Sequence, residues 1–271
     1  RGAEFTWFLS LLPQWLFTGA VLLIIYFALD TYYYKKEHWT AISADHREHK
    51  PLCLKGGINL LYLLCVVLAV AFVNVGMIPA MGEPGAPLWL QYLREIILLS
   101  LTFISIYTTK RKVRYELNHF SWSPIVEVAV LFLGIFTTMT PALAYLSDNA
   151  AALGLNQTWH FYYLTGALSS FLDNTPTAVA FHSVAAGLTP DQMAAFGGNL
   201  VAGVPEVLLQ AICLGAVFFG SMTYIGNGPN FLVKAIAEES GIKMPSFFGY
   251  MFRFSLIVLL PVYILVQLIF L

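Results

Sequence analysis

An acidic residue and its polar neighbours interrupt an apolar stretch of the sequence, residues 159–187. Asp173 is followed by Asn174, Thr175 and Thr177. A carboxylate inside a membrane segment is costly and marks a functional site. Its oxygens, together with the amide and hydroxyl oxygens beside it, can bind a hard cation such as Na⁺. In a low-dielectric environment a carboxylate also binds a proton more readily, so it can exchange H⁺ for Na⁺. The alternative is that Asp173 only caps the helix that follows it.

A second interruption lies in the apolar stretch 205–237, where the sequence Gly-Asn-Gly-Pro occupies positions 226–229. Two glycines and a proline within four residues oppose helical hydrogen bonding, so we expect the helix to unwind there. Unwound backbone at membrane depth is tolerated only where protein buries it or where it lines a cavity. The amides of Asn227 and Asn230 can bind an ion or substrate, and the alternative is a kink without a ligand. Two successive interruptions are typical of transporter binding sites.

The composition excludes a soluble enzyme. Of the 271 residues, 58% are hydrophobic and 11% are charged, whereas soluble domains carry about 25% charged residues. Fourteen Lys and Arg against fifteen Asp and Glu leave no basic surface for nucleic acid. No nucleophile with a base, phosphate loop or zinc-ligand spacing is recognisable, so we do not expect an enzyme. The sequence predicts an all-α polytopic protein in a lipid bilayer.

The lengths of the apolar stretches predict the helices that position these residues. A membrane-spanning helix needs about 20 apolar residues. From Trp159 to Leu172 there are 14 residues, or about 21 Å of helix, which is short of a bilayer core of roughly 30 Å. We therefore expect 159–187 to form a re-entrant helical hairpin with its tip at Asp173–Pro176, and 205–237 to form a broken helix. Five further stretches are long enough to cross, namely 12–34, 57–78, 90–109, 124–146 and 248–271.

The basic residues predict the orientation, because short cytoplasmic loops carry the excess of Lys and Arg. The loops 35–56 and 110–123 are therefore predicted to be cytoplasmic, and the C-terminus is predicted to lie outside. In this orientation the hairpin must enter and leave by one face, which gives six transmembrane helices and one re-entrant hairpin. The basic residues of the two loops are Lys35, Lys36, Arg47, Lys50 and Lys55, and then Lys110, Arg111, Lys112 and Arg114.

The two interrupted segments carry a family resemblance. LTGALSSFLDNTPTAVAF at 164–181 and GSMTYIGNGPNFLV at 220–233 resemble the second repeat of the ion transporter superfamily, which includes sodium/proton antiporters, arsenite permeases and citrate carriers. The resemblance covers 159–271 and implies a hairpin tip and a Pro-Asn loop that bind ion and substrate. The tip residues it implies are Ser170, Asp173, Asn174 and Thr175, with Thr177 beside them. The loop residues are Gly226, Asn227, Gly228, Pro229 and Asn230.

The same resemblance implies a division of the chain into regions, a cellular membrane and an oligomeric state. The superfamily has two inverted repeats, and only one hairpin and one broken helix are found here. Residues 1–56 are accordingly expected to be the last helix of a largely missing first repeat with a basic loop, 57–146 scaffold helices, and 147–271 the transport region with its final helix at 248–271. By analogy the protein is expected in the bacterial inner (cytoplasmic) membrane, and a homodimer is expected from other superfamily members.

Three functional hypotheses follow. The first is a secondary transporter of Na⁺ and/or H⁺, by sodium/proton antiport, in which Asp173 exchanges the proton and Asn174, Thr175 and Asn227 help to bind Na⁺. His182 is a candidate proton relay, with a packing role as the alternative. The second hypothesis is Na⁺-coupled transport of citrate, a dicarboxylate or another anion, although neither motif contains a Lys or Arg to pair with it. The third is a non-transporting membrane scaffold. No cofactor beyond the coupling ion is expected.

Overall fold

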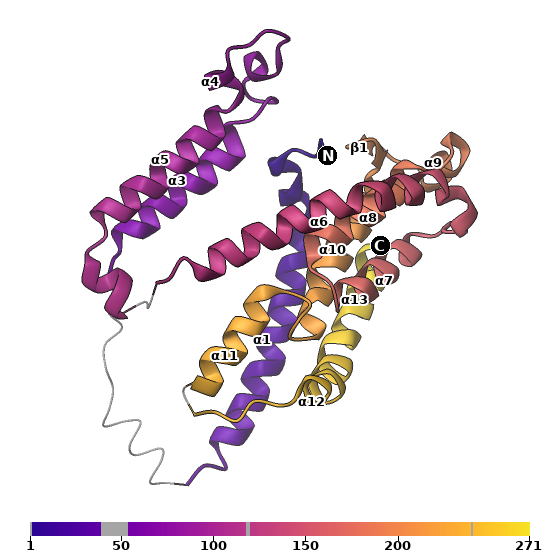
Figure 1. Ribbon diagram of the computed structural model, residues 1–271. Coiled ribbons are helices and arrows are strands. Elements are labelled where there is room, and N and C mark those ends of the chain that lie inside the picture. The colour runs from indigo at the N-terminus through magenta and orange to yellow at the C-terminus, as the bar shows by residue number, and fades with distance from the viewer. Residues whose placement is uncertain (1, 39–53, 118–119, 240) are drawn as a thin grey trace. The chain divides into compact units, whose positions relative to one another are not determined.

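The regular structure is almost entirely helical, which confirms the all-α class. The computed structural model of the protein describes residues 2–38, 54–117, 120–239 and 241–271 (Figure 1). Residues 39–53 of the predicted loop 35–56, and 118–119 of the loop 110–123, lie outside the described residues. The strands within the described ranges are β1 (Leu200–Val201) and β2 (Val204–Pro205), which pair antiparallel.

The chain divides into two compact units. Unit 1 comprises residues 1–3, 10–33 and 130–271, and unit 2 comprises residues 4–9 and 34–129. Within the described ranges, two helices are long and apolar enough to cross a membrane, Phe5–Tyr34 and Phe247–Phe270. These helices correspond to the first and last predicted spans, 12–34 and 248–271. The count of six transmembrane helices stays a prediction.

The first and last helices are built from several helical types. The 3₁₀ helix η1 (Phe5–Leu11) leads directly into α1 (Leu12–Tyr34). At the other end of the chain, α12 (Phe247–Tyr250) continues through the π-helical η6 (Met251–Leu259) into α13 (Leu260–Phe270).

Unit 2 is built on the packed pair α3 (Ile58–Phe72) and α5 (Leu93–Thr108). Both helices are shorter than the predicted 57–78 and 90–109. Asn74 explains the end of α3, because its amide donates to the Ala71 carbonyl at 2.8 Å and accepts from the Met77 N–H at 3.0 Å. The remaining elements are η2 (Pro79–Gly82), α4 (Leu88–Gln91) and η3 (Lys112–Leu117).

In unit 1 the two interrupted segments pack against each other. The helices α7 (Thr158–Ser169) and α8 (Asn174–Ala186) form the two short arms expected of a hairpin, and both contact α10 (Glu206–Phe219) (Figure 1). After α10 come the short η5 (Gly220–Met222) and then α11 (Gly228–Glu239). From Val130 onward, α6 (Ser123–Asp148), which contains Pro141, also belongs to unit 1, as do η4 (Ala150–Leu153) and α9 (Pro190–Phe196).

Both interruptions differ in detail from the predicted ones. Pro176 already lies inside α8, so the turn of the hairpin falls at 170–173 rather than at Asp173–Pro176. Gly228 and Pro229 begin α11, so regular α-helix is absent from 220–227 instead of 226–229. Proline explains this second shift, because it is well tolerated in the first turn of a helix, where its missing N–H has no intrahelical partner.

Candidate functional site

Two glycines bring α7 and α10 into close contact. A Cβ atom on Gly215 would lie 2.5 Å from the Tyr162 carbonyl oxygen and 3.4 Å from the Gly166 nitrogen. A Cβ on Gly166 would meet the Phe219 ring at 2.5 Å. Small residues of this kind let two helix backbones approach closely inside a membrane. The consequence is that side chains at the end of α7 reach the backbone at the end of α10.

Two serines at the end of α7 hydrogen-bond to backbone carbonyls of α10. The Ser169 hydroxyl donates to the Ala216 carbonyl at 2.6 Å, and the Ser170 hydroxyl contacts the Phe219 carbonyl at 3.2 Å. Both serines are buried. The hydroxyl of Ser170 also lies 3.0 Å from the carbonyl of Gly166 in its own helix. The end of α7 is thus tied to the last turn of α10.

Asn174 joins the hairpin to the last turn of α10 and to the second interruption. Its amide nitrogen donates to the Ala216 carbonyl at 2.9 Å, to the Gly226 carbonyl at 3.2 Å and to the Ser169 hydroxyl at 2.8 Å. This orientation of the amide is required because the reverse would set its oxygen against the two carbonyl oxygens. A Cβ on Gly220 would collide with this amide. Asn174 is the side chain that links the two predicted motifs.

Thr223 fixes the interruption from the other side. Its hydroxyl is fully buried, donates to the Ser170 carbonyl and accepts from the Gly226 N–H at 3.1 Å. A Cβ on Gly226 would lie 2.9 Å from the carbonyl oxygens of Ser169 and Ser170. Gly226 is therefore required here for close packing against the end of α7.

The two asparagines of the loop organise the start of α11. The Asn230 N–H donates to the Asn227 side-chain oxygen at 3.0 Å, as in a helix cap. The Asn230 amide nitrogen contacts the Thr223 carbonyl at 3.2 Å and the Gly220 carbonyl at 3.4 Å. Asn230 therefore satisfies carbonyl groups that the interruption leaves without helical partners.

Side chains of the last long helix satisfy further backbone groups of the interruption. The Tyr250 hydroxyl donates to the Ser221 carbonyl at 3.1 Å, and the Ser255 hydroxyl donates to the Met222 carbonyl at 2.7 Å. The Ser221 and Tyr263 hydroxyls lie 2.6 Å apart. Non-helical backbone within a membrane requires such partners. The geometry is therefore that of an unwound segment enclosed by protein.

Comparison with known families covers the whole chain. A family model described as "Putative citrate transport" matches residues 1–271. The chain belongs to this citrate transport family. The family is part of the ion transporter superfamily, which confirms the resemblance found in 159–271. No match was found among curated proteins or solved structures. Membership of a transporter family disfavours the scaffold hypothesis.

In this member of the citrate transport family, Asp173 caps α8. Its carboxylate accepts from the Asn174 N–H at 2.8 Å, and its backbone carbonyl accepts from the Thr177 hydroxyl at 3.0 Å. Thr177 is buried, Asp173 is half-buried and Thr175 is exposed. Within the described ranges, the hydrogen bonds of the Asp173 carboxylate stay inside the hairpin. The capping role is thus present, and the role of Asp173 in ion binding stays a prediction.

His182 lies further along α8, away from the tip. Its Nε2 atom is 3.1 Å from the carbonyl oxygen of Ala202, in the turn between β1 and β2. Ala202 has a φ of 54°, a conformation that L-residues seldom adopt. The imidazole therefore contacts a strained turn, and its predicted relay role stays a prediction.

Several residues of this site were missed by sequence reasoning. Ser169 and Thr223 were not chosen as site residues, although each hydrogen-bonds across the interface. The available signal was a pair of small polar residues at the end of a short apolar helix and a threonine three residues before Gly226. Nothing in the sequence pattern pointed to Tyr250, Ser255 and Tyr263.

Proposed function

We propose that the protein is a cation-coupled transporter of a citrate-class organic anion. The cation and the substrate bind where the tip of the α7–α8 hairpin meets the interruption between α10 and α11. The observation that carries this proposal is the Asn174 amide, which is hydrogen-bonded to Ala216 in the last turn of α10 and to Gly226 within the interruption. The family description supports a citrate-class substrate.

The four helix ends at this interface supply both signs of partial charge. The C-terminal ends of α7 and α10 present carbonyl oxygens, which attract a cation, and the N-terminal ends of α8 and α11 attract an anion. The start of α8 already carries the Asp173 carboxylate, whereas α11 begins after the neutral Asn227. We therefore assign a substrate carboxylate to the start of α11.

The cation is assigned to the hairpin tip together with Asn227 of the interruption. Carboxylate, amide, hydroxyl and backbone carbonyl oxygens are the ligands that hard cations prefer. Asp173, Asn174 and Asn227 are the assigned Na⁺ ligands. The full set of residues in the proposed site is Ser170, Asp173, Asn174, Thr175, Thr177, Gly226, Asn227, Gly228, Pro229 and Asn230.

The proposal includes a topology. Six helices cross the membrane, the hairpin is re-entrant, and the basic segments 35–56 and 110–123 face the cytoplasm. Apolar helices and membership of a transporter family support an integral membrane protein. In this arrangement the hairpin tip lies near the midplane, where transporter sites are found.

The test is citrate uptake by the protein reconstituted in liposomes with an inward Na⁺ gradient. Replacing Asn174 with Ala should lower uptake about tenfold, since buried polar groups lose their partners. Asn149→Ala is the matched control, because its amide donates to the Tyr145 carbonyl in the last turn of the preceding helix α6, and it should leave uptake within about twofold. Citrate uptake by Asn174→Ala at the wild-type rate would contradict the proposal. Wild-type uptake that is the same with and without a Na⁺ gradient would contradict it as well.

A second candidate function is sodium/proton antiport, and Asp173 favours it. Asp173 is the acidic residue of the segment 159–187, and a carboxylate suits cation exchange better than anion recognition. In this alternative the Asp173 carboxylate exchanges a proton for Na⁺, with Asn174 and Asn227 as further ligands.

Proton movement separates the two candidates. A Na⁺ pulse given to liposomes that contain a pH-sensitive dye, without citrate, should produce a pH change only if the protein is an antiporter. Asp173→Asn should abolish that change. If Asp173→Asn leaves Na⁺-driven proton movement intact, antiport through this carboxylate is wrong.

A further inference from the structure

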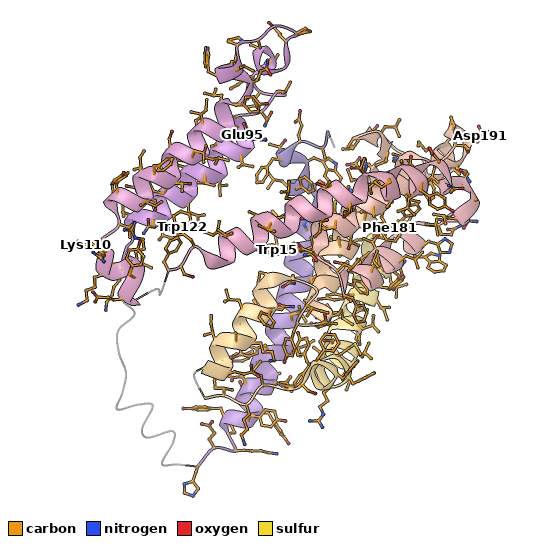
Figure 2. All side chains as sticks on the ribbon, in the orientation of Figure 1. Trp15, Glu95, Lys110, Trp122, Phe181 and Asp191 are labelled. Atoms are coloured by element: carbon orange, nitrogen blue, oxygen red, sulfur yellow. The ribbon has the colours of Figure 1, made fainter. Side chains whose placement is uncertain are left out.

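An open pocket lies at one end of the α3–α5 pair, entirely within unit 2. Its volume is about 960 Å³. The start of α3 meets the end of α5 there, since the Asn59 side-chain oxygen accepts from the Ser105 and Thr109 hydroxyls, both at 2.9 Å. Figure 2 shows Lys110 and Trp122 at this end of the pair, away from Glu95. The pocket shares no residue with the proposed transport site.

Two cationic side chains line this pocket, and one of them is incompletely satisfied. The Arg114 guanidinium donates to the Ile106 carbonyl at 2.7 Å through Nη1, and it packs over the Tyr115 ring at 4.6 Å. Among the described residues, the buried Nε atom of Arg114 has no hydrogen-bond partner. Lys55 is exposed at the same pocket, and the described lining contains no Asp or Glu. The polar part of the pocket is thus electropositive.

The first turn of α3 adds to this positive potential. The 15-residue helix begins at Ile58, and the Asn59 and Leu60 N–H groups donate to the Gly56 and Gly57 carbonyls at 2.9 Å and 3.0 Å, so the start of α3 contributes through its helix dipole. Gly56 precedes it with a φ of 84°, and a Cβ there would lie 3.1 Å from Val113. This glycine therefore permits the start of α3 to approach the segment that carries Arg114. Helix N-termini beside basic side chains bind phosphate groups.

The other walls are apolar and aromatic. Aliphatic side chains from both helices line the rest of the pocket, and Trp122 is among the lining residues. Tryptophan is typical of the headgroup level of a bilayer. The basic run Lys110–Lys112 predicts that this end of the pair faces the cytoplasm. The aliphatic lining residues are Leu54, Leu60, Leu63, Val66, Leu101, Ile106, Val113 and Ile125.

We propose that this pocket binds one anionic glycerophospholipid. The phosphate lies against Arg114, Lys55 and the first turn of α3, and the acyl chains follow the aliphatic wall. A net negative lipid is favoured over a zwitterionic one, because two cationic side chains face the headgroup and the described lining offers no carboxylate for an ammonium group. The proposal is independent of the transported substrate.

The test is native mass spectrometry of the full chain released from nanodiscs of phosphatidylglycerol and phosphatidylcholine in equal amounts. The wild-type protein should retain one phosphatidylglycerol, and the double variant Lys55→Gln/Arg114→Gln should retain it about tenfold less often. The single variant Lys55→Gln changes only an exposed side chain, so the protein should still fold. This variant should also retain less phosphatidylglycerol than the wild-type protein. Lys112→Gln is the control, because Lys112 is exposed and lies outside the pocket lining.

Three results would overturn the proposal. Equal retention of the two lipids would show that the headgroup charge is not recognised. A loss in Lys112→Gln as large as in Lys55→Gln would show diffuse attraction by the basic segment instead of a site. Displacement of the lipid by millimolar inorganic phosphate would assign the pocket to a soluble anion.

Discussion

The α7–α10 contact and the α3–α5 pair hold two helices together by different means. In the first, facing glycines bring the backbones together and α10 buries nine residues, including Leu208 and Ile212. In the second, α5 buries no residue, and side-chain hydrogen bonds from Asn59 and Tyr62 join the helices. Figure 2 shows side chains projecting outward along α3 and α5. Close backbone packing thus coincides with the interrupted helices, where polar groups need fixed partners.

The variant with the largest expected effect on this comparison is Gly215→Val, in the α7–α10 contact. Its side chain would overlap the Tyr162 carbonyl, so we expect a loss of about 3 kcal/mol in the free energy of unfolding. Thermal unfolding in detergent measures the change. Gly19→Val in α1 is the matched control, because none of the residues that the structure describes lies within 4 Å of a Cβ at Gly19. If both variants unfold at the same temperature, close approach of α7 and α10 is not what stabilises unit 1.

A smaller effect is expected from Thr223→Val, which preserves shape and removes one buried hydroxyl. The Gly226 N–H and the Ser170 carbonyl would lose their partner, at a cost of about 2 kcal/mol. Thr102→Val in α5 removes an exposed hydroxyl bonded to the Leu98 carbonyl of its own helix, and should change little. Equal stabilities for the two variants, measured by chemical unfolding, would remove the distinction between the two regions.

Asn59→Ala tests the polar contacts of the α3–α5 pair. Two interhelical hydrogen bonds disappear, and at an average of about 0.6 kcal/mol each in a membrane, the loss is about 1 kcal/mol. Hydrogen exchange of the α3 amides should accelerate accordingly. Unchanged exchange would mean that other contacts hold this pair together.

The smallest expected change is that of Tyr62→Phe. The Tyr62 hydroxyl lies 2.9 Å from the Thr108 hydroxyl at an exposed position, and the threonine also bonds to the Ile104 carbonyl. The loss should therefore be about 0.5 kcal/mol. A destabilisation as large as that of Thr223→Val would show that the α3–α5 pair is more tightly coupled than its exposure indicates.

The sequence predicted the helical segments better than the contacts between them. Apolar length and the Gly-Pro pattern located both interruptions, and the pairing of Asn174 with Gly226 lies within the two motifs that carried the family resemblance. The roles of Ser169 and Thr223 depend on which faces of α7 and α10 meet. Gly166 and Gly215, which lie in different helices, decide this by allowing the two backbones to approach. The bond from Tyr250 to Ser221 spans 29 residues, so no local pattern encodes it.

The central claim is that the hairpin tip and the interruption of the α10–α11 segment form one binding unit. A double-mutant cycle of Asn174→Ala and Thr223→Val, read as Na⁺-driven citrate uptake in liposomes, tests it most directly. Both side chains meet at Gly226, so residues acting as one unit should give strongly non-additive losses. We predict that each single variant loses about tenfold and that the double variant loses no more than about tenfold. Losses that multiply to about a hundredfold would contradict the account.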